Sequence, residues 1–263
     1  MSITVTWEGV NGMPFALEGE LDKLRGPILS KPTGLTGTIN RTLVQNPNGV
    51  GSIISGYSIP IMEGSLAVRV YADPETGLTV GETYESFVTS FSPLKPGRLT
   101  VTDSRGYPWH CDLLLSETIP TPEQSPLTVP LPWIDVTISV VCMQGLWVGE
   151  TKTYGAGTSV QVENPGDFPC YPKIVWKGRD KIITPPGATP ISLPTTNATR
   201  VLDSDPGTGY VITDTAGSVD VGTWRTMRGL AVYGRVDAGD KAIWGVGEGV
   251  TLEVTPLCMN PWR

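Results

Sequence analysis

The chain is poor in the side chains that most enzymes use for acid–base chemistry and metal binding. Its 263 residues include a single histidine, His110, so a site with two or three histidine ligands is excluded. A Ser-His-Asp triad would have to use that histidine. The nearest match to a nucleophile elbow, residues 56–60, has Pro60 in place of the last glycine and no helical pattern after it. Neither Ser58 nor His110 is therefore predicted to be catalytic, and His110 is expected at a strand edge.

Cysteine is also sparse. The chain has four, Cys111, Cys142, Cys170 and Cys258, and no CxxC pair, so the spacings of zinc sites and redox-active dithiols are absent. A disulfide or a reactive thiol is one interpretation. The expectation for a chain made in a cytoplasm is four small buried apolar side chains.

Long apolar runs and blocks of basic residues are missing as well. No run approaches the ~18 residues of a membrane span, and the first residues have neither a basic segment nor a long apolar core, so no signal peptide and no membrane are expected. The 26 acidic residues outnumber 19 basic ones, for a net charge of −7, which disfavours attraction to nucleic acid. Charged residues make up only 17%, which excludes a highly charged disordered chain.

Motifs for phosphate and calcium are absent. No GxxxxGK[ST] loop occurs. The glycine-rich residues 245–249 are predicted to form a β-turn or bulge, because no strand-then-helix pattern surrounds them. Residues 203–207 resemble a calcium loop only faintly, without a third acid or a bidentate glutamate, and are predicted to form a turn. We therefore predict no catalytic, cofactor-binding or metal-binding residue, and no cofactor.

What the chain has in abundance is glycine and proline, 31 and 24 residues, about a fifth against a usual ~12%. So many helix breakers favour short strands joined by turns. Apolar residues alternate with polar ones in five places, which predicts half-buried strands there. These strands centre on residues 3–8, 66–71, 136–140, 160–162 and 251–255.

One segment has helical periodicity. Tyr84, Phe87, Val88 and Phe91 recur at i, i+3, i+4 and i+7. Thr79 stands three residues before a glutamate, which is a capping box, and the prolines from position 93 onward end the pattern. We expect a short helix whose aromatic face packs on a sheet.

The proline-rich residues 120–132 begin a change in pattern that ends near residue 153. Before this region the pattern mixes strands with the helix, and after it the pattern contains only strands and turns, as far as residue 255. We therefore place two domains at residues 1–149 and 150–263.

Eight tryptophans are many for this length. Flat indole faces suit sugar rings, whereas core packing is the commoner role. Trp7 and Trp176 lie in strand patterns and are predicted to be core residues. Either role is open for four others, which flank strands. These are Trp133, Trp147, Trp244 and Trp262.

The order of these elements, and one stretch in the second half, carry a family resemblance. Residues 162–174 read V-x-N-x-G-D-x-x-x-x-P-x-I, from Val162 to Ile174. With the strand, capped helix and strand pair of the first half, this stretch resembles the distal tail proteins, or minor tail proteins, of siphovirus-type bacteriophages. In that family the stretch begins a galectin-like domain.

The resemblance implies a mainly β virion structural protein. It implies an N-terminal ring-forming β domain with one short helix, followed by a galectin-like β-sandwich. Six copies would form a hexameric ring at the tail tip, between the tail-tube protein and the baseplate hub protein, with DNA only passing through the lumen. The ring would scaffold host-recognition parts such as receptor-binding proteins.

Two other functions compete with this one. A β-sandwich module could recognise host cell-wall sugars through its tryptophans. A wall hydrolase is disfavoured by the single histidine and the lack of a paired acidic motif, so we predict a protein that is not an enzyme.

Overall fold

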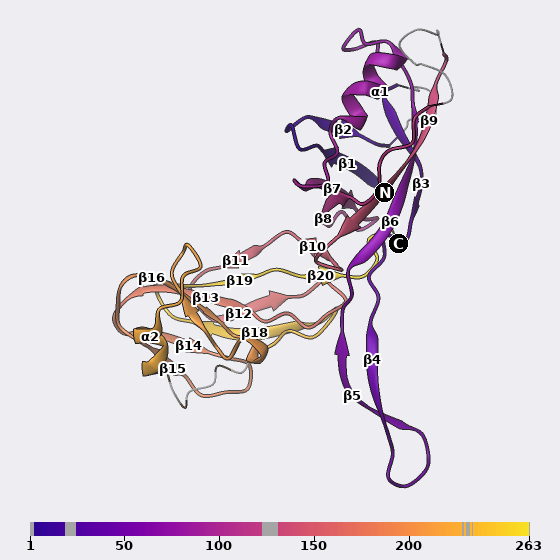
Figure 1. Ribbon diagram of the computed structural model, residues 1–263. Coiled ribbons are helices and arrows are strands. Elements are labelled where there is room, and N and C mark those ends of the chain that lie inside the picture. Colours follow the sequence, from indigo (N-terminus) through magenta and orange to yellow (C-terminus); the bar gives the residue numbers. More distant parts are fainter. Residues whose placement is uncertain are drawn as a thin grey trace. The chain divides into compact units, whose positions relative to one another are not determined.

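The computed structural model describes residues 3–18, 25–122, 131–227, 229, 232 and 234–262. The fold is mainly antiparallel β-structure (Figure 1), which confirms the predicted class. The chain divides into two compact units, the first made of Met1–Val148 with Cys258–Arg263 and the second of Gly149–Leu257. The last six residues, which the sequence had suggested for the second domain, thus belong to the first unit.

The first unit is built on one large sheet. Its strands follow the order β2-β1-β7-β8-β9-β6-β3, and β10 pairs with both β8 and β20. The elements of this unit are β1 (Thr4–Glu8), β2 (Pro14–Ala16), β3 (Pro27–Thr33), β4 (Asn40–Gln45), β5 (Ser52–Ser58), β6 (Met62–Val70), α1 (Val80–Val88), β7 (Gly97–Thr102), β8 (Pro108–Leu115), β9 (Ile134–Cys142), β10 (Trp147–Gly149) and β20 (Leu257–Cys258).

The predicted alternation sets which face of the sheet is buried. In β1, Val5 and Trp7 are buried while the residues between and after them are not. The same pattern holds for Leu66, Val68 and Val70 in β6, and β9 repeats it from Ile134 to Cys142. The period of two therefore located these strands correctly.

Helix α1 begins with the predicted capping box. The Thr79 hydroxyl accepts from the Glu82 amide at 3.3 Å, and the Glu82 carboxylate accepts from the Thr79 amide at 2.9 Å. These two bonds satisfy amides that have no partner inside the helix. The Thr79 amide and the Thr79 hydroxyl both donate to the Glu82 carboxylate and lower its pKa, with the backbone bond as the larger cause.

The aromatic face of α1 is buried in the core of the first unit, as predicted. Phe91 stacks on Trp7 with ring centroids 4.3 Å apart, and Phe87 meets Phe91 edge to face at 5.2 Å. The Trp7 indole donates to the Ser90 hydroxyl at 2.8 Å. Gly97 leaves room for this indole, because a Cβ there would lie 2.4 Å from the ring. Helix and sheet are thus joined by one aromatic cluster.

The chain end is fixed to the first unit by two tryptophans. Trp147 and Trp262 meet edge to face at 5.7 Å. Both indoles donate to the Leu35 carbonyl, at 3.1 and 3.3 Å respectively. Trp147 is fully buried, so its role is core packing. The proline-rich segment joins β8 to β9 in this unit, and its residues 123–130, with Pro126 and Pro130, lie outside the described residues.

A buried carboxylate organises the turn between β7 and β8. Asp103 accepts hydrogen bonds from the amides of Arg105 and Tyr107 at 2.9 and 3.0 Å and from the Trp109 indole at 3.2 Å. The Arg105 guanidinium pairs with it at 2.8 Å. Burial raises the pKa of Asp103, but these bonds outweigh burial and leave the pKa lowered.

We expect Asp103→Asn to reduce the free energy of unfolding by about 1–3 kcal/mol at pH 7, because buried donors lose a charged acceptor. The lowered pKa means that the carboxylate stabilises the fold fully above the unfolded pKa, and less as the pH falls through the folded pKa. Denaturant titrations at pH 7 and below pH 4 should show the gap between the variant and the original chain shrinking with acid. A gap that does not depend on pH would contradict this.

The second unit is a sandwich of two antiparallel sheets. One has the order β11-β19-β13-β16-β17 and the other β12-β18-β14-β15. Buried residues of both sheets form one core cluster. The elements are β11 (Lys152–Tyr154), β12 (Gly157–Glu163), β13 (Lys173–Gly178), β14 (Lys181–Thr184), β15 (Ile191–Leu193), β16 (Thr196–Asp203), η1 (Pro206–Thr208), β17 (Ile212–Thr213), α2 (Val221–Thr226), β18 (Lys241–Val246) and β19 (Val250–Val254).

The stretch that carried the resemblance has a structural role here. Asn164 is buried, and its amide nitrogen donates to the carbonyls of Phe168, Val236 and Asp237 at 2.6, 3.0 and 3.2 Å. Its side-chain oxygen accepts from the Gly166 amide at 3.0 Å. One asparagine thus links four backbone groups of two segments far apart in sequence, with its two N–H donors shared among three carbonyls.

Within the part of the chain that is described, no helix has the length and apolar character needed to cross a membrane.

Candidate functional site

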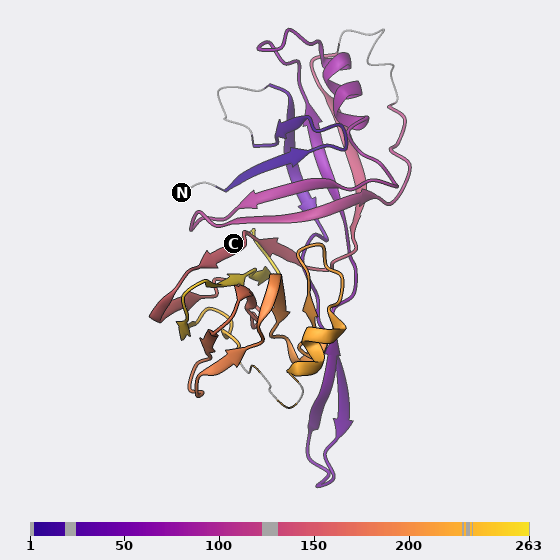
Figure 2. The same cartoon turned by 90° about the vertical axis from the view of Figure 1, so that its left-hand side faces the viewer.

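A protruding hairpin is the main exposed feature of the first unit. Strands β4 and β5 form a two-stranded sheet of their own, with Asn40 opposite Ser58 at its base. The hairpin extends away from the rest of this unit in both views (Figure 1 and Figure 2). Every residue of β4 is exposed, and all of β5 but one.

The hairpin carries apolar side chains on both of its faces. Leu43 lies opposite Ile54, and Val44 lies opposite Ile53. Because neighbours along a strand point to opposite faces, one of these pairs lies on each face. These four side chains are each 52–58% exposed, and Tyr57 is 63% exposed.

Such a hairpin is unusual for a surface that stays in water. Antiparallel strands with one wet face alternate apolar and polar residues, whereas apolar residues on both faces are typical of strands buried on both. An isolated two-stranded hairpin is at best marginally stable in water. Its free strand edges can also pair with another chain. The hairpin therefore has the properties of an assembly surface.

The residues that were considered for catalysis do not form a site. Ser58 ends β5, and His110 lies on β8 opposite Thr100, in a different sheet. His110 is half-buried, and burial lowers its pKa, with the Arg98 guanidinium as a second cause. Residues 56–60 form strand and loop without a following helix, so they are no nucleophile elbow. The described residues hold no cluster of three or more potential metal ligands.

The two glycine- and aspartate-rich stretches are turns, as predicted. Residues 245–249 end β18 and turn into β19, and Gly249 has a positive φ of 69°. Asp205 caps the short helix η1 by accepting from the Gly207 amide at 2.7 Å. The glycine and aspartate residues of these stretches are therefore explained by turn and cap geometry.

All four cysteines are buried and unbridged. The Cys111 and Cys142 thiols hydrogen-bond each other, and this bond lowers the pKa of Cys142 to about 7 while burial raises that of Cys111. Burial also raises the pKa of Cys170, to about 11.

We expect all four thiols to be protected from a bulky alkylating reagent in the folded protein and to react once it is denatured. Intact mass should therefore show no adduct before denaturation and four after it. Two adducts or none after denaturation without a reductant would reveal a disulfide and contradict this.

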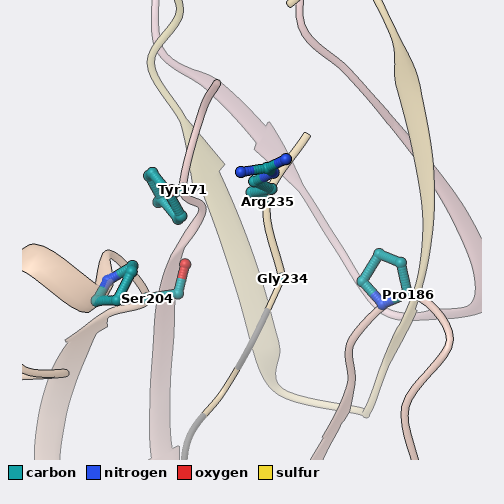
Figure 3. A pocket seen from close by; sticks show the side chains of 6 residues that line it. Tyr171, Pro186, Ser204, Gly234 and Arg235 are labelled. Carbon is teal, nitrogen blue, oxygen red and sulfur yellow. The ribbon is translucent and has the colours of Figure 1, made fainter. Parts of the chain in front are cut away.

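A pocket of about 410 Å³ opens on the second unit (Figure 3). It is lined by Tyr171, Pro186, Ser204, Pro206, Gly234 and Arg235. Figure 3 shows the ring of Tyr171 and the guanidinium of Arg235 next to each other, with Ser204 on the side of Tyr171. These residues come from loops and from η1, in segments that are far apart in sequence, so no local motif identified them.

The tryptophans are mostly core residues. Trp7 and Trp176 are buried, as predicted, and so is Trp244. Trp133 is 43% exposed and lies beneath Arg69, whose guanidinium carbon is 5.0 Å from the ring centroid. No tryptophan is among the residues that line the pocket.

Over nearly its whole length the chain has the fold of proteins from the baseplates of tailed bacteriophages. It is similar to the Dit protein of phage SPP1, which is described as a paradigm of the hub adsorption apparatus in phages that infect Gram-positive bacteria. The TM-score is 0.58 and the sequence identity is 14%, and the match covers 98% of this chain and 99% of that one. It is also similar to chains of the phage P2 baseplate in its activated conformation with Ca and with Sr. In both the TM-score is 0.50, with 9% and 10% identity and coverage of 97% of this chain and 98% of the other.

No protein-family model and no curated protein matches the sequence. The resemblance to distal tail proteins, first seen in short motifs, is confirmed at the level of the fold.

Proposed function

We propose that this protein is a structural component of a bacteriophage tail tip, a distal tail protein whose copies close into a hexameric ring. The single observation that carries the proposal is the hairpin of β4 and β5, apolar on both faces and exposed in the isolated chain. Similarity in fold to a Dit protein and to baseplate chains supports the same function.

A second copy of this chain is the partner that the hairpin fits best. Strands that are apolar on both faces are stable when both faces are buried. A ring buries them when each subunit packs its hairpin against the next subunit. Such a contact joins two unlike surfaces and is repeated around the ring, which closes if the rotation per subunit divides the circle. The first unit would thus form the ring, and the second would lie at its periphery.

The position of the ring follows from the same proposal. It would lie between the tail-tube protein and the tail-tip hub protein, in the virion, after synthesis in the host bacterial cytoplasm. The galectin-like second domain would scaffold host-recognition parts such as receptor-binding proteins. An acidic chain with a net charge of −7 suits a lumen through which DNA passes without adhering. No catalytic step is part of this role.

Removing the second unit tests which part assembles. Because β10 and β20 pair with each other, residues 150–256 can be replaced by a short Gly-Ser linker while residues 257–263 stay with the first unit. We expect light scattering to give about six copies for this variant and one copy for residues 149–257 alone. A folded first unit that stays monomeric beside an oligomeric second unit would refute the proposed division.

A further inference from the structure

The pocket on the second unit combines flat apolar walls with a few polar groups. Tyr171, Pro186 and Pro206 each contribute a ring to its lining. Its volume of about 410 Å³ is within the range of roughly 300–1,000 Å³ that is usual for small-molecule sites. A sugar ring has C–H faces that stack on such rings, above all on a tyrosine, which offers an apolar face and a polar tip.

The polar groups of the pocket match hydroxyl groups. The lining residue Arg235 is paired through Nε with Asp237 at 2.9 Å, so a donor in the pocket wall has an acceptor directly next to the pocket. Ser204 is only 1% exposed and donates its hydroxyl proton to the Pro172 carbonyl at 2.6 Å, so it supports the pocket wall and Arg235 carries the exposed polar group. A sugar hydroxyl both donates and accepts, and therefore suits this mixture better than a group that only accepts.

Charge around the pocket disfavours an anionic ligand. Asp237 offsets the positive charge of Arg235. Asp203 and Asp205 flank Ser204 in the sequence, and the whole chain is acidic. The Asp205 carboxylate caps η1, which begins with the pocket residue Pro206.

The lining is held in place by contacts beneath it. The backbones of Cys170 and Val236 exchange two hydrogen bonds of 2.9 Å, which sets Tyr171 and Arg235 beside each other. The buried Asn164 amide donates to the carbonyls of Val236 and Asp237. Gly234 lies against the indole of Trp244, and a Cβ there would be 2.1 Å from the ring. A site fixed in this way loses little entropy on binding.

We propose that this pocket binds an uncharged hexopyranose ring, with its C–H face on Tyr171 and its hydroxyl groups on Arg235 and the adjacent Asp237 carboxylate. The site lies in the second unit and uses no residue of the hairpin, so sugar binding and ring assembly can each fail without the other. The inference therefore goes beyond the structural role proposed above and does not depend on it.

Tryptophan fluorescence of the full chain measures binding, because Trp244 lies directly beneath Gly234 of the pocket. The probes are glucose, galactose, rhamnose and N-acetylglucosamine, each titrated to about 100 mM, well above a millimolar Kd. Glucuronate serves as the charged comparison. We expect saturable binding of at least one neutral sugar and weaker binding of glucuronate.

Two variants locate the site. Tyr171→Ala removes the stacking ring and Arg235→Met removes the guanidinium, and we expect each to weaken binding about tenfold or more. Tyr171→Phe should retain most of the affinity, because the ring stays. Arg179→Met is the matched control, since this exposed arginine does not line the pocket, and it should bind like the original chain. Arg235 is more than half exposed, so its variant keeps the fold, as circular dichroism should show.

Three results would overturn the inference. The first is no saturable signal with any neutral sugar. The second is binding that both Tyr171→Ala and Arg235→Met leave unchanged, which would place the sugar elsewhere. The third is tighter binding of glucuronate than of every neutral sugar, which would make the pocket an anion site.

Discussion

Replacing the four apolar residues near the hairpin tip should convert the proposed ring to single copies. The variant Leu43→Thr, Val44→Thr, Ile53→Thr and Ile54→Thr keeps residues that favour strands. It removes side chains whose burial is worth about 1.5–3 kcal/mol each. We expect the dissociation constant of the assembly to rise by more than a thousandfold, as measured by analytical ultracentrifugation over a dilution series.

The matched control makes the same chemical change on the second unit. Ile182 and Ile243 are exposed β-branched residues of β14 and β18, and Ile182→Thr with Ile243→Thr should leave the assembly intact. A hairpin variant that assembles as tightly as the original chain would show that the hairpin is not the contact. Loss of assembly in both variants would show that the effect is not specific to the hairpin.

The largest expected loss of stability comes from Phe87→Ala. Phe87 is fully buried between Phe15 and Phe91, with ring centroids at 5.3 and 5.2 Å. Truncation leaves a cavity in this aromatic cluster, so we expect the free energy of unfolding of the first unit to fall by about 3–5 kcal/mol. For a unit of this size the melting temperature should drop by about 10 °C.

Leu94→Ala is the control for this change, because Leu94 follows the helix and is 88% exposed. It should alter stability by less than about 0.5 kcal/mol. Calorimetry of both variants decides the matter, and an unchanged transition in Phe87→Ala would mean that the helix face does not support the sheet.

The strands and the helix were predictable where a single physical rule decides the residue pattern. In β1 and β9 one face is buried and one is wet, so apolar residues recur with a period of two. The start of helix α1 could be predicted from Thr79, because a side-chain oxygen is needed to accept hydrogen bonds from the first amides of the helix. These local rules leave a trace in the sequence that needs no knowledge of the rest of the fold.

The hairpin could not be found in this way. Its adjacent apolar residues, Leu43 with Val44 and Ile53 with Ile54, break the alternation, because both faces are apolar. Strand β3 was missed for another reason. It contains Pro27 and Pro32, which argue against a central strand but are tolerated at the sheet edge where β3 lies.

The pocket and the C-terminal contacts depend on tertiary structure alone. Tyr171 and Arg235 are neighbours only because Cys170 and Val236 pair as an isolated bridge. Trp262 reaches the Leu35 carbonyl from the other end of the chain. The helix α2 was not predicted either, since six residues with one glycine carry too weak a periodicity.

The most direct test of the central claim is an image of the purified chain by negative-stain electron microscopy. Six copies of the 28.2 kDa chain, joined by one repeated contact, should give class averages with sixfold symmetry and a central hole. Single particles without symmetry at high protein concentration, or open chains of variable length, would contradict the ring.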